Sequence, residues 1–305
     1  MSLSIPRDVG SIPKRRHFLE AFALKAAIAA FSPLSVDSAS WLMGKLWRHV
    51  LPFKRRNRRM LANLAYLMPE LTPDRRLEIA AEVRENIGRV FMEAFRLQEI
   101  AGDDSRYDLT QSAELGAIAN NGGCVLASLH QGNWEVNTSA AIKLGFRPAG
   151  VYRQLTNPIV EAFVLKARAP FYPGGLFSKR PGGDIARRLL TFVKSGGALA
   201  ILADLKDDSG VSLNFIGKPS TASAFPAFIA RMTGRPLIAG RMVRTKGVRF
   251  RCETEQIEVP VTADRHADIA EATRRLALVF ERWIRENPEQ WLWTHRKWIL
   301  PGEMP

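Results

Sequence analysis

The feature that most constrains the fold of this chain is a change of pattern near residue 120. From there on, short apolar runs alternate with segments of helical periodicity. The apolar runs are residues 124–129, 147–152, 198–204, 236–243 and 248–259. The helical segments are residues 135–144, 159–169, 183–196, 223–234 and 263–285. Strands that alternate with helices are typical of α/β folds, so we predict a mixed, largely parallel sheet flanked by helices.

The first hundred residues have helical patterns only. Thr72 is suited to cap a long amphipathic helix that has Pro73 at its first position. An earlier helix is predicted to have a broad apolar face, made of Trp41, Leu42, Leu46, Trp47 and Val50. We therefore expect a helical N-terminal region over residues 1–105 and an α/β domain over residues 106–305, which together form one structural unit.

Residues 17–36, HFLEAFALKAAIAAFSPLSV, are apolar but contain Glu20 and Lys25. The segment has no convincing signal-peptide cleavage site, and it lacks a charge-free span long enough for a good transmembrane helix. An amphipathic helix lying in a membrane interface fits better, because the basic residues 14–16 precede it. The alternatives are a single membrane-spanning anchor helix and an ordinary packed helix of a soluble domain.

The charge of the chain narrows the class of partner. Its 44 Lys and Arg against 30 Asp and Glu give a net charge of +14, which favours nucleic acid, anionic lipid, phosphorylated substrates or an acidic carrier protein. Basic residues gather in the run 54–59, which either binds such a partner or forms a solvated helix face. The two cysteines, Cys124 and Cys252, imply no disulfide framework and favour a reducing, cytosol-facing location.

Two histidines are followed five positions later by an acid: His130 by Glu135, and His266 by Glu271. Spacing alone therefore identifies no site. His266 and Glu271 lie in a predicted helix, where residues five apart point about 140° away from each other. Glu271 is better placed to meet Arg274 or Arg275, so we interpret this match as a solvated helix face.

His130 has a different context, because it directly follows the predicted strand 124–129. Ligands of open α/β sheets bind at the carboxyl ends of strands. Gly132 permits a tight turn, and Asn133 can cap the helix that Glu135 begins. The turn would bring His130 and Glu135 together as a general base and its orienting carboxylate. A histidine that merely completes a strand end remains the alternative.

The residues HQGNWE then resemble the histidine–acid block of glycerolipid-type acyltransferases, in the form found in the bacterial late lipid A acyltransferases. Four further blocks in the same order resemble that family. They are RRMLANLAYLMPELTPDRRLEIAAEVRENIGRVFMEAF, VYRQLTNPIVEAFVLKAR, ALAILADLKDDSGVSLNFIGKPSTASAFPAFIARMTGRPLI and the Trp-rich NPEQWLWTHRKW. The resemblance covers roughly residues 20–298 and departs at Leu205, where the family usually has Gln after Asp.

The resemblance implies a glycerolipid-acyltransferase-like fold and acyl transfer to a hydroxyl of a lipid A precursor. The donor would be a thioester on an acyl carrier protein or on CoA, and the enzyme would act at the cytoplasmic face of the bacterial inner membrane. His130 would be the base and Glu135 its partner, with no cofactor, no metal and no acyl-enzyme. No Gly-x-Ser-x-Gly nucleophile motif occurs in the sequence.

Further residues are assigned to oxyanion or substrate binding. The backbone amides near Gly132 and Asn133 are candidates for the oxyanion, as are the guanidinium groups of Arg153 and Arg168. Asp204 ends a predicted strand at the same sheet edge and either orients an arginine, binds substrate or forms a structural pair. The tryptophans of the C-terminal block lie either in the membrane interface or on the core.

Three other functions are compatible with parts of the sequence. An acyltransferase of the same superfamily with another membrane glycolipid as acceptor would have the same catalytic pair. A basic nucleic-acid-binding protein fits the net charge, but the sequence has no recognised binding motif and no long basic stripe, so we expect no nucleic-acid partner. A non-catalytic membrane protein is disfavoured because His130 and Glu135 are both present.

Overall fold

A seven-stranded sheet organises the protein, as seen in a computed structural model that describes residues 14–50, 54–120, 122–152, 154–178, 184–295 and 297–298. The strand order is β1-β9-β8-β2-β5-β3-β4. The strands are β1 (Tyr107–Asp108), β2 (Cys124–Gly132), β3 (Pro148–Tyr152), β4 (Gly175–Ser178), β5 (Ala198–Leu202), β8 (Leu237–Arg244) and β9 (Phe250–Ile257). All neighbours are parallel except β8 and β9. The predicted fold class is thus confirmed.

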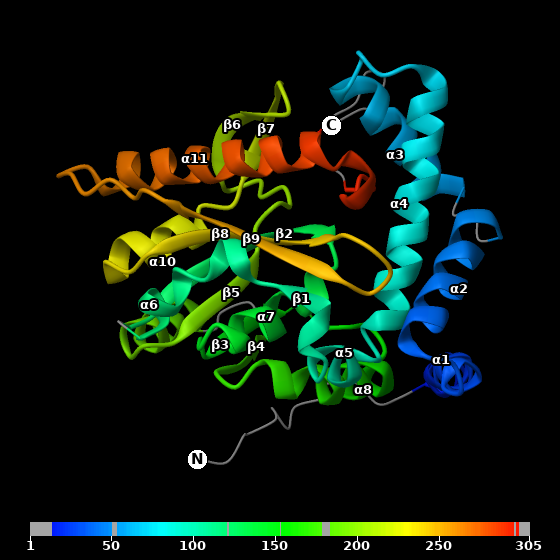
Figure 1. Cartoon of the computed structure of the whole chain (residues 1–305). Helices are drawn as coiled ribbons and strands as arrows, with labels where there is room; N and C mark the ends of the chain where they lie inside the picture. Colours follow the sequence, from blue (N-terminus) through cyan, green and yellow to red (C-terminus); the bar gives the residue numbers. More distant parts are fainter. Residues whose placement is uncertain are drawn as a thin grey trace.

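Helices surround this sheet (Figure 1). In the N-terminal region they are α1 (Arg15–Phe31), α2 (Val36–His49), α3 (Lys54–Leu67), α4 (Pro73–Glu93) and α5 (Leu97–Ala101). The remaining helices are α6 (Leu115–Asn120), α7 (Asn137–Lys143), α8 (Pro158–Arg168), α9 (Ile185–Lys194), α10 (Phe225–Thr233) and α11 (Arg265–Glu286). An antiparallel hairpin of β6 (Val211–Phe215) and β7 (Lys218–Ala222) lies outside the main sheet and was not predicted.

The side chains of β2 point alternately into two apolar clusters, one on each face of the sheet. Val125, Ala127 and Leu129 belong to the largest apolar cluster, which also holds residues of α3, α4, α9, α10 and α11. Cys124 lies on the other face, in a smaller cluster with residues of α6 and α7. Because side chains alternate along a strand, His130 shares the face of Cys124. The sequence pattern therefore directs His130 toward α7 and away from the main core.

The N-terminal helices pack onto the sheet as well as onto each other. Met60 and Leu64 of α3 and Val83 of α4 lie in the same cluster as the strand residues of β2. The predicted start of α4 is confirmed, since the Thr72 side chain accepts a hydrogen bond from the Arg75 amide with Pro73 next to it. Within the described ranges, no helix combines the length and apolar character needed to cross a bilayer.

The predicted helix is present as α2, and its broad apolar face is only partly buried. Trp41, Leu42 and Val50 are exposed, whereas Ala39 and Met43 are buried against α4. Gly44 of α2 and Gly88 of α4 explain the choice, because any side chain on Gly88 would collide with Met43 and Trp47. Close packing of small residues selects the narrow face and leaves large apolar side chains outside.

The tryptophans of the C-terminal block pack into the core. Trp291, Trp293 and Trp298 are all buried in the main apolar cluster. Trp291 and Trp293 contact each other edge to face, with ring centroids 4.8 Å apart. Their position favours core packing over the membrane-interface alternative.

Candidate active site

His130 lies near the end of β2, which continues two residues beyond it to Gly132. Gly132 has a φ of 58°, and a Cβ there would lie 1.7 Å from the carbonyl oxygen of Met242. The turn therefore requires glycine. Asn133 then caps the 3₁₀ turn Trp134–Val136 by accepting a hydrogen bond from the Glu135 amide at 2.9 Å. The predicted roles of Gly132 and Asn133 in turn formation are confirmed.

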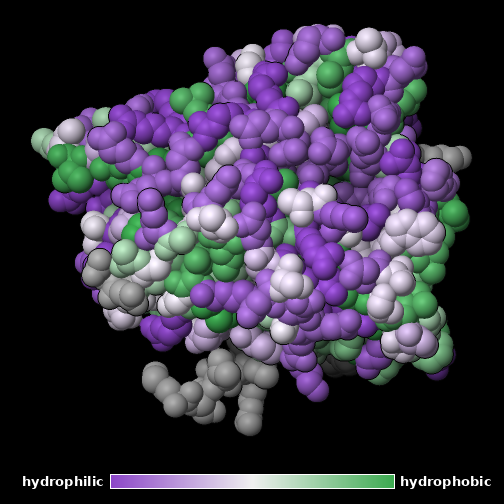
Figure 2. Space-filling view, in the orientation of Figure 1, coloured by the Kyte–Doolittle hydropathy of each residue, from purple (hydrophilic) through white to green (hydrophobic). Residues whose placement is uncertain are grey.

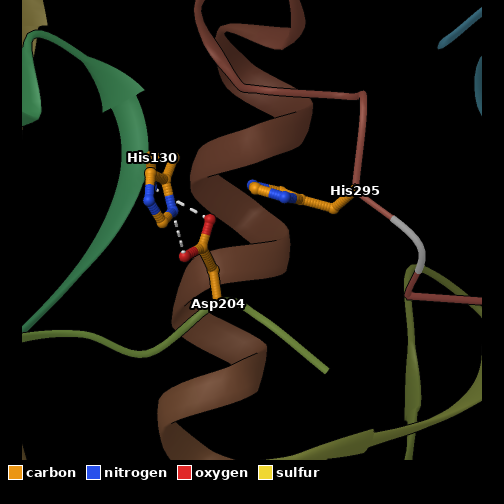
Figure 3. A group of neighbouring side chains, drawn as sticks. All are labelled: His130, Asp204 and His295. Atoms are coloured by element: carbon orange, nitrogen blue, oxygen red, sulfur yellow. Dashed lines mark hydrogen bonds and ion pairs between the residues drawn. The ribbon is translucent and has the colours of Figure 1, made fainter. Parts of the chain in front are cut away.

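The carboxylate that holds the imidazole of His130 is Asp204 (Figure 3). The Nδ1 atom of His130 lies 2.8 Å from Oδ1 of Asp204, and the His130 amide donates to Oδ2 at 2.9 Å. Trp291 donates its indole N–H to the same Oδ2. Asp204 is fully buried and follows β5, the parallel neighbour of β2. The strand register brings these two residues together.

Glu135 does not take the expected place beside the imidazole nitrogen. Its carboxylate forms a two-point ion pair with Arg168 at the end of α8, where Nε donates to Oε2 at 2.9 Å and the second guanidinium nitrogen donates to Oε1. The reason is the 3₁₀ turn, which places Trp134 against the His130 ring, with centroids 5.3 Å apart, and directs Glu135 toward α8. The His130 ring thus donates its hydrogen bond to Asp204 and not, as expected, to Glu135.

The electrostatics of the pair favour an ionised carboxylate and a basic imidazole. Burial disfavours the imidazolium, but the charge and hydrogen bond of Asp204, with the charge of Glu135, outweigh it and raise the pKa of His130. Burial also disfavours ionised Asp204, yet His130, His295 and the His130 amide together lower its pKa. Nδ1 therefore carries the proton of neutral His130 and donates a hydrogen bond to Asp204. This leaves Nε2 as the basic nitrogen.

A buried carboxylate behind the turn was not predicted from the sequence. Glu93, the last residue of α4, accepts hydrogen bonds from the side chains of Asn133, Ser40 and Arg244. Arg244 contributes two of them, at 2.7 and 2.9 Å. A buried, fully bonded ion pair of this kind fixes the groups around it. Glu93 thereby ties the turn after His130 to α2, α4 and β8.

The backbone groups near Gly132 make internal contacts. The amide of Asn133 donates to the carbonyl of Met242 at 3.3 Å, and the carbonyl of Gly132 accepts from the Asn86 side chain at 2.8 Å. The Asn133 amide is therefore occupied, which corrects its expected assignment as an oxyanion donor. Arg153, the other candidate from the second block, lies outside the described residues.

His295 lies beside both His130 and Asp204 (Figure 3), and the centroids of the two imidazole rings are 5.0 Å apart. Burial lowers the pKa of His295 to about 4. The charge of Asp204 opposes this effect, and the charge of His130 adds to it. Ligand atoms of His130, Asp204 and His295 all lie within 4.8 Å of one another, a set that could hold a metal ion. A metal there would replace the Nδ1 proton that orients His130.

A large cavity opens beside His130. It has a volume of about 1010 Å³, and its polar end includes His130, Glu135 and Arg168. Its apolar lining comes from strands and helices beneath, and includes Leu115, Leu126, Ala141, Phe146 and Ile238. Leu205, which stands where the resembling family has Gln, also lines the cavity and is exposed. The arrangement suits a ligand that has a long apolar part and a reacting polar end.

The second histidine–acid match has the structure predicted for it. Glu271 pairs with Arg275 at 2.9 Å and with Arg274 at 3.5 Å, and His266 is exposed near the start of α11. Cys124 and Cys252 are both free and buried. Of these two histidines, His130 is the one that lies at a cavity and beside a buried carboxylate.

Comparison with known families decides the class of protein. Residues 12–299 match the family of bacterial lipid A biosynthesis acyltransferases. The chain belongs to this family. The match confirms the resemblance found in the sequence and extends over nearly all of the chain, so His130, Asp204 and the cavity all lie within the acyltransferase fold. No curated protein matches the chain significantly.

Proposed function

We propose that this acyltransferase moves a fatty acyl chain from a thioester of acyl carrier protein or CoA to a hydroxyl of a lipid A precursor, with His130 as general base. The observation that carries the proposal is the position of His130. It is oriented by the buried carboxylate of Asp204 and lines an apolar cavity of about 1010 Å³. A basic nitrogen at the end of a hydrocarbon-lined cavity is what transfer of a long acyl chain requires.

The reaction needs one proton acceptor and no covalent enzyme intermediate. Nε2 of His130 takes the proton of the acceptor hydroxyl as its oxygen attacks the thioester carbonyl. Asp204 stabilises the imidazolium that forms, because its charge and hydrogen bond favour the protonated ring. When the tetrahedral intermediate collapses, the C–S bond breaks and the leaving thiolate takes the proton from His130. An ester and a free thiol result.

Arg168 is the described cation best placed to stabilise charge on the reacting carbonyl or to hold substrate. It lines the cavity with His130, and it is fixed by its two-point bond to Glu135. Guanidinium groups suit oxyanions and phosphates because they donate in a fixed fork. We assign Glu135 the role of positioning Arg168 and of adding negative charge near His130, which raises the pKa of the ring.

The acyl chain would lie in the apolar part of the cavity, between α6, α7 and the sheet. Leu115, Ala141 and Phe146 line it at this end, and they belong to a buried cluster that also contains Cys124 and Ile238. The depth of the cavity would then set the preferred chain length. Carrier protein and CoA would present the same thioester to His130, so donor choice rests on surfaces outside this cavity.

Membrane attachment would use the outer face of α1 and α2. Phe18, Leu19 and Phe22 of α1, with Trp41 and Leu42 of α2, are exposed. Hydrophobic side chains of these helices are visible along the right-hand edge of Figure 2. The basic residues at the start of α1 would meet anionic headgroups. We propose peripheral binding to the cytoplasmic face of the bacterial inner membrane.

The test is acyl transfer by the purified protein. Wild type and His130→Ala are incubated with a tetraacyl lipid A precursor and a panel of carrier-protein and CoA thioesters, and products are read by mass spectrometry. We expect wild type to add one acyl chain and His130→Ala to be slower by about 10² or more. Thioester hydrolysis through His130 without transfer would mean that another membrane glycolipid is the acceptor. Equal rates in both proteins would refute the role of His130.

A further inference from the structure

A second cavity adjoins the large cavity beside His130, and the two share Trp134 in their lining. Its volume is about 380 Å³, and it is bounded by α2, α3, α4 and residues 292 and 294. Trp134 lines both cavities and packs against the His130 ring, with centroids 5.3 Å apart. A ligand held in the small cavity would therefore be separated from His130 by the side chain of Trp134.

Two arginines, Arg84 and Arg56, line the small cavity, together with Asn57. The Arg84 guanidinium donates to the side-chain oxygen of Asn57 and, at 3.4 Å, to the carbonyl of Arg48. Within the described ranges no carboxylate pairs with Arg84. Burial lowers its pKa, and the nearby charge of Arg48 lowers it further. An anion in the cavity would relieve this repulsion.

Glu85 does not neutralise the positive charge of Arg84. Its carboxylate already pairs with Lys45 at 3.0 Å, with Arg48 at 3.2 Å and with Arg89 at 2.8 Å. One acid thus serves three cations, and Arg84 is a fourth cation in the same region of α2 and α4. A cavity lined by two guanidinium groups and a side-chain amide is suited to a phosphate group, which accepts several charge-assisted hydrogen bonds.

The position of the cavity indicates which phosphate it would take. Its wall includes Trp47 of α2, and on the outside of the same helix Trp41 is 53% exposed and Val50 is 60% exposed. The apolar part of a molecule bound there would lie near the exposed apolar side chains of α2, which we propose to face the membrane. A carrier-protein donor would instead bring its acyl chain into the large cavity. The arrangement favours an amphipathic, anionic lipid.

Building on the proposed function, we propose that this cavity binds a phosphate of the acceptor glycolipid, with Arg84 as the main ligand and Arg56 and Asn57 beside it. The phosphate would anchor the sugar headgroup so that its hydroxyl-bearing chain passes Trp134 to reach His130. Specificity for a phosphorylated acceptor would then come from α3 and α4, and specificity for the acyl chain from the large cavity.

The test compares the same acceptor with and without its phosphates. Transfer rates are measured for wild type, Arg84→Gln and Arg56→Gln. Arg76→Gln serves as a matched control, because Arg76 also lies on α4 but bonds only to the backbone carbonyls of Pro69 and Leu71 in this structure. We expect wild type and the control to prefer the phosphorylated acceptor by about tenfold or more in kcat/KM. Arg84→Gln should lose that preference and keep its rate on the dephosphorylated acceptor.

Other outcomes would overturn the inference. An unchanged preference in Arg84→Gln and Arg56→Gln would place the phosphate elsewhere. A rise in the KM of the donor alone would mean that the cavity serves the carrier. Weaker binding to vesicles containing phosphatidylglycerol, with both acceptors affected alike, would mean that it holds a phospholipid headgroup.

A binding measurement distinguishes failure of the phosphate site from failure of the proposed function. Calorimetry with His130→Ala measures binding of the phosphorylated acceptor without turnover, and adding Arg84→Gln should weaken it by about tenfold. If wild type makes no product from either acceptor, the proposed function fails. If wild type is active but Arg84→Gln changes neither binding nor preference, only the phosphate site fails. Since Arg56 is exposed, its variant gives the same readout should Arg84→Gln not fold.

Discussion

His130 and Asp204 are joined by two hydrogen bonds, one from the backbone amide of the histidine and one from its ring. The first fixes the carboxylate relative to β2, and the second fixes the ring relative to the carboxylate. Asp204 is buried and also accepts from Trp291, so it has little freedom to turn. A base held in this way has one tautomer and one orientation.

The titration of His130 should report this contact. Its raised pKa means that the ring remains protonated to a higher pH than an ordinary histidine, above about 6.5. In Asp204→Asn the contributions that raise the pKa are largely lost and burial remains, so the pKa should fall below that of wild type. Nitrogen-15 NMR of labelled histidine measures both values. An identical titration in the two proteins would show that Asp204 does not act on the ring.

Glu135 and Arg168 should behave as one unit. Removing either partner from a half-buried, two-point ion pair leaves the other uncompensated. We expect Glu135→Gln and Arg168→Gln each to lower kcat, and the double variant to be no slower than the slower single variant. A double-variant cycle of transfer rates measures this coupling. Strictly additive losses would mean that the two side chains contribute separately.

Glu93 should position the turn that follows His130. Glu93→Gln breaks the buried pair with Arg244, which should cost about 3 kcal/mol of unfolding free energy or more. It should also lower kcat in protein that is still folded, because Asn133 loses its charged partner. Asp268→Asn is the control, since Asp268 pairs with Arg231 away from the site. Equal kcat in both variants would limit Glu93 to a role in stability.

The exposed face of α1 and α2 should control membrane binding. Replacing Phe22 and Trp41 together by serine removes two exposed apolar side chains, at 73% and 53% exposure, and should weaken binding to anionic vesicles by about tenfold or more. Leu278→Ser, at an exposed leucine of α11, should leave binding unchanged. Vesicle sedimentation measures the difference. Comparable loss in the control would exclude a specific membrane face on these two helices.

The sequence predicted the layers of this fold because periodicity is a local signal. The runs at 124–129 and 198–204 became the neighbouring strands β2 and β5, and Thr72 begins α4 as expected. The strand order is not local. Ser128 lies opposite Leu202 in the parallel register, and extending that register by two residues brings His130 to Asp204. Without the order of strands, Glu135 was the nearer acid along the chain and therefore the expected partner.

Two other features also depend on tertiary packing. The apolar face of α2 was predicted, but Gly44 and Gly88 allow closer packing on a different face, so part of the apolar face stays exposed. In the sequence, Glu93 is one of several charged residues of a predicted helix. Its buried ion pair is formed with Arg244, which lies 151 residues away along the chain. Pairings over such separations leave no mark in the local pattern of a single sequence.

The most direct test of the account is the rate of acyl transfer in Asp204→Asn beside Asp268→Asn. Asp268 is a matched control, because it is also a buried aspartate but pairs with Arg231, away from both cavities. If Asp204 orients the base, Asp204→Asn should be slower by about 10² or more, with the donor KM little changed, and folded Asp268→Asn should retain wild-type activity. Full activity in Asp204→Asn would contradict the assignment of His130 and Asp204 as the catalytic pair.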